Sequence, residues 1–345
     1  MSLVSGQYAW NQPGNAPQPQ VAAAAERQLQ IWLTPHGFLK AAMENNATAK
    51  KGNGGTVVSF VIGKFKVNGT IDAQNMVTKT ETWIPNPVLG DMLVETTYSG
   101  YKDFNGVKFP TMIVQKRRSA TLPPVNVQTQ KLADGVWWLG GGTHHSVLVE
   151  YPNYLVMIEG PLNESRSLAL IAEAKTLVPN KPIKYLINTH HHFDHSGGMR
   201  TYIAEGATII TNEMNKPFFE QTLKSPRTLE PDELSRNPKK PAFITVKDKY
   251  VLADGGRSLE IYHVEGDNHN AGIMMVYLPK EKILVEADDF TPAAPNAPST
   301  GPCAHGHTVH LYEYVQRLKL DVSTITPLHG FVVPFSELQR AVGNG

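Results

Sequence analysis

Four histidines and one aspartate lie within six consecutive residues of this chain, in the run His190-His191-His192-Phe193-Asp194-His195. Imidazoles and carboxylates are donors that suit zinc or iron, and in an extended segment His190 and His192 point to the same side. The run follows the apolar residues 185–187 and precedes Gly197-Gly198. We therefore expect a metal site on a loop at the carboxyl end of a strand, where functional residues of layered proteins gather.

One loop cannot supply a complete set of metal ligands, and three further donors follow at similar positions. His269 lies in a turn between two apolar runs, Asp288 follows the apolar residues 283–285, and His329 follows another such run. Each is next to small or turn-forming residues, as a site assembled from loops at one rim requires. Asp289 is the competing neighbour of Asp288.

The elements that would position these donors follow residue 126. Strands are predicted at 136–139, 146–150, 154–159, 184–189, 207–211, 242–246, 258–263, 272–277, 283–286 and 324–327. Helices are predicted at 164–177, with Asn163 as its cap, and at 198–204, 212–223 and 307–319. This order predicts an α/β (α+β) chain whose residues 127–345 form two sheets flanked by helices, an αββα sandwich.

The preceding residues show a different pattern. Residues 1–20 are predicted to be a disordered arm, because 11–20 is rich in Pro, Gln and Asn. Residues 21–118 are predicted to form a smaller domain, with a helix at 21–44 that is interrupted near Pro35 and an antiparallel sheet. Its strands are expected at 56–67, 76–84, 93–101 and 109–116, with hairpin turns at Asn68-Gly69 and Asn105-Gly106. Residues 119–126 are the predicted linker.

Composition narrows the class of partner. The chain has 345 residues, with Lys+Arg 32 and Asp+Glu 31, and its net charge of +1 argues against nucleic acid as a partner. The chain has no run of eighteen apolar residues, so no membrane span is predicted. The single cysteine, Cys303, allows no intrachain disulfide. A small-molecule substrate is expected, and the sequence leaves a homo-oligomer open.

These motifs, in this order, resemble the metallo-β-lactamase superfamily over about residues 130–331. The resemblance implies that His190, His192 and His269 bind a first metal ion. It implies that Asp194, His195 and His329 bind a second ion and that Asp288 bridges the two. Glu159 replaces the aspartate that the family usually has after the second strand of its opening hairpin.

The activity implied by the resemblance is that of a dinuclear metal-dependent hydrolase. Two divalent ions are expected, with zinc preferred and iron or manganese also accepted by these donors. A hydroxide that bridges the ions would cleave an ester, lactone, thioester or amide of a small molecule, and Asp194 would orient it or pass its proton to the leaving group. Members that cleave β-lactams normally have Cys or Ser at the position of Asp288, so this activity is expected to be weak or absent.

The alternative is a non-hydrolytic member of the same fold. It would be a mononuclear iron oxygenase of the persulfide type, or a binding protein with a vestigial metal site. The N-terminal extension resembles the leader domain of exported bacterial members. We therefore expect the bacterial periplasm, for a chain that lacks its signal peptide, in preference to the cytoplasm.

Three other histidines are candidates for the substrate pocket. His144 and His145 follow Gly140-Gly141-Gly142, and either a pocket role or hydrogen bonding within the loop would fit them. His307 follows the bridging aspartate in the chain and is a candidate for the pocket or a lid.

Overall fold

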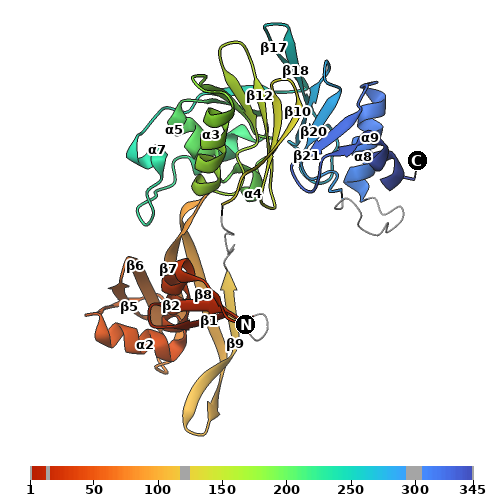
Figure 1. Ribbon diagram of the computed structural model, residues 1–345. Helices are drawn as coiled ribbons and strands as arrows, with labels where there is room; N and C mark the ends of the chain where they lie inside the picture. Colours follow the sequence, from red (N-terminus) through yellow and green to blue (C-terminus); the bar gives the residue numbers. More distant parts are fainter. Residues whose placement is uncertain (1, 13–15, 117–124, 293–304, 344–345) are drawn as a thin grey trace. The chain divides into compact units, whose positions relative to one another are not determined.

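The computed structural model describes residues 2–12, 16–116, 125–292 and 305–343. The chain forms two compact units, one of Met1–Asn86 with Asp91–Leu122 and the other of Pro87–Gly90 with Pro123–Gly345 (Figure 1). The linker expected at 119–126 lies outside the described residues except for 125 and 126. Within the described ranges, no helix combines the length and the apolar character needed to cross a bilayer.

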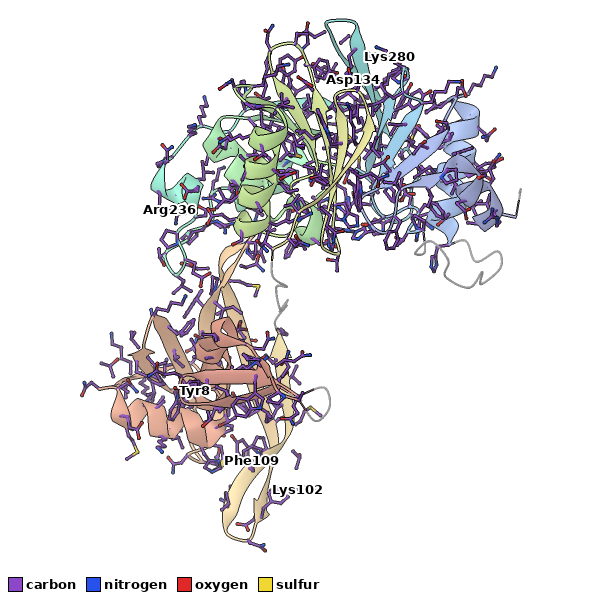
Figure 2. The ribbon with its side chains drawn as sticks, viewed as in Figure 1. Tyr8, Lys102, Phe109, Asp134, Arg236 and Lys280 are labelled. Atoms are coloured by element: carbon purple, nitrogen blue, oxygen red, sulfur yellow. The ribbon has the colours of Figure 1, made fainter. Side chains whose placement is uncertain are left out.

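The described part of residues 1–20 is ordered, so the prediction of a disordered arm is wrong there. Strands β1 (Ser2–Ser5), β2 (Tyr8–Asn11) and β3 (Gln18–Pro19) form a three-stranded antiparallel sheet, with the Tyr8 side chain exposed on it (Figure 2). Arg27 fixes this sheet, because its guanidinium donates to the carbonyls of Leu3 and Trp10 at 3.0 and 2.8 Å. The prediction was based on the polar composition of this segment, which does not reveal that backbone pairing and one arginine stabilise it.

The rest of the first unit is the predicted combination of helix and antiparallel sheet. The helical part is η1 (Val21–Ala23), α1 (Ala24–Trp32) and α2 (Pro35–Glu44), and the break falls where Pro35 begins a new helix behind the cap Thr34. The six strands are β4 (Thr48–Gly52), β5 (Gly55–Ile62), β6 (Phe65–Ile71), β7 (Val77–Asn86), β8 (Gly90–Phe104) and β9 (Val107–Lys116).

One of the two predicted hairpin turns in this sheet is wrong. Asn105-Gly106 does connect β8 and β9, with φ of 55° and 88°, as a two-residue hairpin requires. Asn68-Gly69 instead lies inside β6, and the chain turns at Gly63. A Cβ atom at Gly69 would lie 2.3 Å from Cζ of Phe38, so this glycine makes room for a buried aromatic ring of α2.

The second unit contains two sheets. The first consists of β10 (Gln128–Ala133), β11 (Val136–Gly140), β12 (Ser146–Glu150), β13 (Leu155–Ile158), β14 (Ile183–Ile187), β15 (Thr208–Asn212) and β16 (Phe243–Val246), in that spatial order. The second consists of β17 (Lys249–Asp254), β18 (Arg257–His263), β19 (Met274–Leu278), β20 (Ile283–Glu286), β21 (Thr324–Pro327) and β22 (Val333–Pro334).

Alternating residues of the first sheet face two separate cores. Val147 and Val149 of β12 pack between the sheets with residues of β18, β19 and β20, whereas Leu148 faces the helices on the outer side. The helices that follow strands of the first sheet are α3 (Glu164–Leu177), α4 (Phe193–Ser196), α5 (Met199–Glu205), α6 (Lys216–Thr222) and α7 (Glu233–Arg236). Helices α8 (Gly306–Arg317) and α9 (Phe335–Ala341) cover the second sheet. The predicted αββα sandwich is confirmed.

The loops that carry the candidate donors all open at one end of this sandwich. The β11–β12 loop is joined to the end of β21 by a hydrogen bond from His145 N to Leu328 O of 2.9 Å, and the end of β14 is joined to β19 by one from Met274 N to Thr189 O. The β10–β11 and β19–β20 turns, with Asp134 and Lys280, lie at the opposite ends of their strands (Figure 2).

Candidate metal centre

The segment after β14 presents two histidines to one side, as its extended conformation dictates. His192 has φ −58° and ψ 148°, and the single turn of α4 that follows brings Asp194 and His195 back toward His190. The intervening His191 bonds elsewhere, with its Nδ1 2.9 Å from Oδ1 of Asn215. The alternation expected from the sequence therefore separates the two donors from their neighbour.

The first group of donors consists of His190, His192, His269 and Asp288, whose candidate ligand atoms lie within 4.8 Å of one another. Oδ2 of Asp288 is 2.7 Å from Nε2 of His269 and 3.2 Å from Nε2 of His190. Nε2 of His190 is buried, and its 3.2 Å contact with Asp288 does not have the geometry of a hydrogen bond. A buried nitrogen of this kind is what a metal ion would satisfy.

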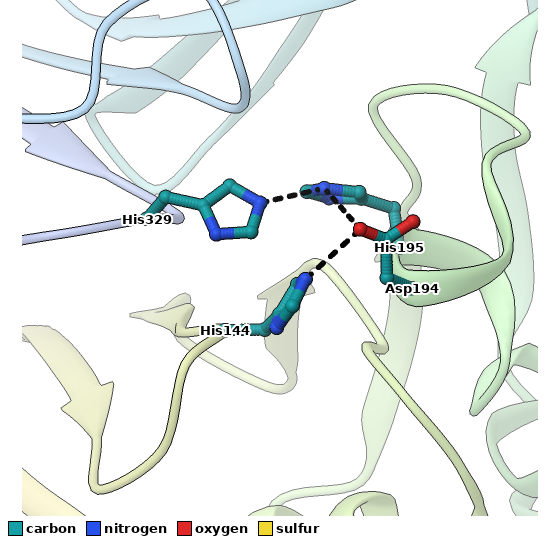
Figure 3. A group of neighbouring side chains, drawn as sticks. All are labelled: His144, Asp194, His195 and His329. Atoms are coloured by element: carbon teal, nitrogen blue, oxygen red, sulfur yellow. Dashed lines mark hydrogen bonds and ion pairs between the residues drawn. The ribbon is translucent and has the colours of Figure 1, made fainter. Parts of the chain in front are cut away.

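The second group consists of His144, Asp194, His195 and His329, which converge from three separate segments (Figure 3). Nε2 of His195 lies 3.0 Å from Nε2 of His329 and 3.9 Å from Oδ2 of Asp194. Oδ1 of Asp288 lies 3.1 Å from His195 and 2.7 Å from His329. Asp288 thus directs one carboxylate oxygen to each group.

Hydrogen bonds behind the rings of His195 and His329 direct their other ring nitrogens inward, toward each other and toward Oδ1 of Asp288. Nδ1 of His195 donates to Oε2 of Glu159 at 3.1 Å, and Nδ1 of His329 donates to the carbonyl of Thr143 at 3.1 Å. Both partners only accept, so in neutral rings each Nε2 carries a lone pair, and the two lone pairs face each other. This arrangement requires positive charge between the rings, supplied by a proton or by a metal ion, and the donor set fits a metal ion.

The electrostatics of the two groups agree with this requirement. Burial lowers the pKa of His190 to about 3, so this ring is neutral, as a metal ligand must be. Burial also acts to lower the pKa of His195, but hydrogen bonds with Asp288 and Glu159 outweigh it and raise the pKa to about 10. Burial would raise the pKa of Asp288, but the surrounding imidazoles hold it well below its usual range. The carboxylates therefore favour positive charge at the centre of the site.

Glu159 supports the site although it replaces the family's usual aspartate. Its side chain is fully buried, and Oε2 accepts from His195 and from the hydroxyl of Thr189, while Oε1 accepts from Asn188 at 2.9 Å. Since Thr189 donates to Glu159, its oxygen is free to accept from Nδ1 of His190, 3.1 Å away. One carboxylate thereby orients a histidine of each group.

Several supporting residues were missed by sequence reasoning. Asp267 accepts backbone bonds from His269 and Asn270 at 2.6 and 3.3 Å, which fixes the turn that carries His269. An aspartate two residues before a turn histidine is a recognisable signal of such a turn. Thr189 and Thr143 gave no signal, because Thr189 meets Glu159 and Thr143 meets His329 only in the folded chain.

The predicted pocket histidines occupy different places. His144 lies in the second group, with Nε2 3.0 Å from Oδ2 of Asp194. The ring of His307 is half-buried, 5.9 Å from that of His269, at the edge of the first group. His145 is buried against Trp138, where burial and then the charge of Arg166 lower its pKa to about 4. The structure does not bring His145 to either group.

Comparisons with known proteins agree with this architecture. A family model described as the metallo-beta-lactamase superfamily matches residues 139–316, more than half of the chain. A comparison with curated proteins finds no match.

Solved structures similar to the chain include a metallo-beta-lactamase from Pontibacter korlensis, with 21% identity over 64% of this chain and 98% of that one, and a TM-score of 0.49. Another comes from Hirschia baltica, with 20% identity over 63% and 97% of the two chains and a TM-score of 0.47. A third, from Pseudomonas aeruginosa in a mono-zinc form, has 18% identity over 64% and 95%, also with a TM-score of 0.47.

The match of the family model, together with the αββα sandwich and the two groups of His and Asp donors at one end of it, shows that this chain belongs to the metallo-β-lactamase superfamily and has the fold of its metal-dependent hydrolases.

Proposed function

We propose that this chain is a dinuclear metal-dependent hydrolase that cleaves an ester, lactone, thioester or amide of a small molecule. The orientation of Asp288 supports the proposal, because Oδ2 faces the first group at 2.7 Å from His269 and Oδ1 faces the second at 2.7 Å from His329. A carboxylate placed in this way can bind one ion with each oxygen. Two divalent ions held there would supply a hydroxide nucleophile at neutral pH and would polarise the substrate oxygen.

The side chains divide between holding the ions and moving a proton. In this proposal His190, His192 and His269 hold the first ion. Asp194, His195 and His329 hold the second, and Asp288 holds both. Nδ1 of His195 donates to Glu159 and Nδ1 of His329 donates to the carbonyl of Thr143, which keeps Nε2 of both rings directed inward.

Asp194 is suited to the proton transfer. Its side chain is 47% exposed, against 0% for His195, so a substrate can reach it. The hydrogen bond from His144 is the main cause that lowers the pKa of Asp194 well below its usual range, so the carboxylate is ionised. In that form it can accept a hydrogen bond from the nucleophile and orient it, or pass its proton on to the leaving group.

The test is elemental analysis of the purified protein, combined with assays on lactones, thioesters, aryl esters and β-lactams. We expect close to two zinc-like ions per chain and turnover of an ester or a lactone, with little cleavage of β-lactams. One iron per chain with oxygen consumption on a persulfide would contradict the proposal and support the oxygenase alternative. Bound metal without turnover on any of these classes would support the vestigial site.

A further inference from the structure

We propose that His144 is a positioning residue that holds Asp194 through a hydrogen bond from Nε2–H to Oδ2, and that Thr143 fixes the proton of His144 on that nitrogen. This inference rests on the proposed function, since Asp194 is the residue to which that function assigns proton transfer. It concerns a histidine outside the ligand set that the resemblance to the family implies.

The four side chains of the second group are close enough for His144 to be either a fourth ligand or a partner of Asp194. Its Nε2 lies 3.0 Å from Oδ2 of Asp194, and its ring is 4.2 Å from that of His329 and 5.4 Å from that of His195 (Figure 3). Distance alone does not distinguish the two roles, but the positions of the protons on the rings do distinguish them.

The two ligand histidines of this group and His144 have opposite surroundings. In His195 and His329 the outer nitrogen, Nδ1, faces an obligate acceptor, so Nδ1 carries the proton and Nε2 is free to bind a cation. In His144 the inner nitrogen, Nε2, faces a carboxylate, and Nδ1 lies 2.7 Å from the hydroxyl of Thr143. A hydroxyl can donate, whereas an ionised carboxylate can only accept.

This pattern gives one consistent chain of donors. The Thr143 hydroxyl donates to Nδ1 of His144, and Nε2–H of His144 donates to Oδ2 of Asp194. His144 then has no lone pair directed at the second group, so it acts on the metal ligand Asp194 and not on the ion. The backbone carbonyl of Thr143 meanwhile holds His329, so Thr143 positions two histidines of the group.

The loop that carries Thr143 and His144 is itself fixed. The buried Arg166 donates from Nη2 to the carbonyls of Gly140 at 2.8 Å and His144 at 3.3 Å. Gly141 has φ 96°, and a Cβ atom there would lie 2.3 Å from the carbonyl oxygen of Asn126, so a side chain is excluded. His144 is therefore held in place before any ligand arrives, as a positioning residue must be.

The test compares His144→Ala with His144→Gln in the full-length protein. Glutamine can offer a side-chain N–H to Asp194, but its amide is a poor ligand for zinc. Metal-free protein is titrated with Zn²⁺ against a chromophoric chelator. We expect His144→Ala to weaken binding of the second ion by about 10–100-fold, with the first ion unaffected, and His144→Gln to recover most of the loss.

A pair of substitutions at Thr143 provides the matched control. Both keep the backbone carbonyl that holds His329. Thr143→Ser keeps the hydroxyl and should bind the second ion like the wild type. Thr143→Val removes the hydroxyl and should weaken binding of the second ion. Equal affinity in all of these variants and the wild type would overturn the proposal. His144→Gln as weak as His144→Ala, with a changed Co²⁺ absorption spectrum in both, would instead make His144 a metal ligand.

A second measurement keeps this inference separable from the proposed function. In ¹⁵N-histidine spectra of the metal-free protein, we expect the proton of His144 on Nε2, with Thr143→Val shifting it toward Nδ1. If the wild type binds a single ion or turns over no substrate, the proposed function fails, and this spectrum still tests the His144 hydrogen bond. A His144 proton on Nδ1 in the wild type would overturn the proposed role of His144.

Discussion

Two adjacent aspartates, Asp288 and Asp289, have opposite surroundings. Asp288 is in contact with four imidazoles, which stabilise its ionised form. Asp289 is buried, Oδ1 has no hydrogen-bond partner among the described residues, and burial together with the charge of Asp267 raises its pKa well above the usual range. Asp288 was predicted as the metal ligand from its position in the family motif, and its contacts with the imidazoles give a physical reason for that prediction.

The same substitution at these two neighbours should have different results. Asp288→Asn removes the charge between the two groups of donors, so we expect the metal content to fall by at least one ion per chain and hydrolysis to be lost. Asp289→Asn replaces the buried carboxyl group by an amide of nearly the same shape and should leave both nearly unchanged. Metal analysis of the two variants, purified in parallel, checks this. The reverse result would identify Asp289 as the ligand.

Glu159 should matter for metal binding without touching a metal ion. Glu159→Ala leaves the Nδ1 proton of His195 without its acceptor in a buried place, and we expect metal affinity to fall by about 10–100-fold. Competition titration with a chelator measures it. Glu205→Ala removes an exposed ion pair with Lys175 and serves as the control. Unchanged affinity in Glu159→Ala would show that other contacts suffice to orient His195.

The candidate site was partly predictable because its donors have a strong local signal. The run 190–195 and the donors at strand ends were visible in the sequence, and the structure brings them together except for His191. The residues behind the rings were not visible, because Thr143 meets His329, and Thr189 and Asn188 meet Glu159, only in the folded chain. The departure at Glu159 was noticed, but its support of two histidines depends on side-chain geometry.

At the scale of elements, strands β12, β20 and β21 and helix α3 have the predicted bounds, because the strands have mostly buried side chains and Asn163 caps α3 by accepting from Arg166 N. Strands β10 and β17 were missed. Both are edge strands with mostly exposed side chains, so they lack the hydrophobic pattern that predicts a strand.

Helices α5 and α7 are joined by a charge pair whose strength should depend on pH. Asp232 caps α7 by accepting from Ser235 N, and its two oxygens accept from Arg200 of α5 at 2.5 and 3.0 Å. Burial would raise the pKa of Asp232, but Arg200 and Ser235 outweigh it and hold the pKa well below the usual range. The stabilisation is therefore present above the unfolded pKa of about 3.9 and is lost as pH falls toward the folded pKa.

Asp232→Asn isolates this charge, because asparagine caps a helix as well as aspartate does. We expect the variant to be less stable than the wild type by about 2 kcal/mol at pH 7, with the difference shrinking below about pH 4. Urea denaturation between pH 3 and 7 measures the difference. Asp134→Asn, at a fully exposed side chain, is the matched control and should show no such trend. A difference that stays constant with pH would contradict the role of the charge.

At the scale of the whole molecule, the candidate site belongs to one unit. Every donor lies in the second unit, and its two hydrophobic clusters contain, among the described residues, none from the first. Pro87–Gly90, which is grouped with the second unit, adds no residue to either cluster in the described chain. The N-terminal unit has its own core, built around Phe38 and Phe60.

Removal of residues 1–118 should therefore leave a folded protein that still binds metal. Circular dichroism and metal analysis of the truncated protein, compared with the full chain, check this expectation. Insoluble protein, or metal content well below that of the full chain, would mean that the first unit stabilises the sandwich through contacts that the separate cores do not reveal.

The donors come from both sheets of the sandwich, and this has a thermodynamic consequence. His190, His192 and His195 follow a strand of the first sheet, whereas His269, Asp288 and His329 follow strands of the second. An ion bound by donors from both sheets binds the folded chain and not the unfolded one. At a free concentration 1,000 times its dissociation constant it would stabilise the fold by about 4 kcal/mol. The melting temperature of this protein would then depend on the concentration of free metal ion, and a chelator would lower it.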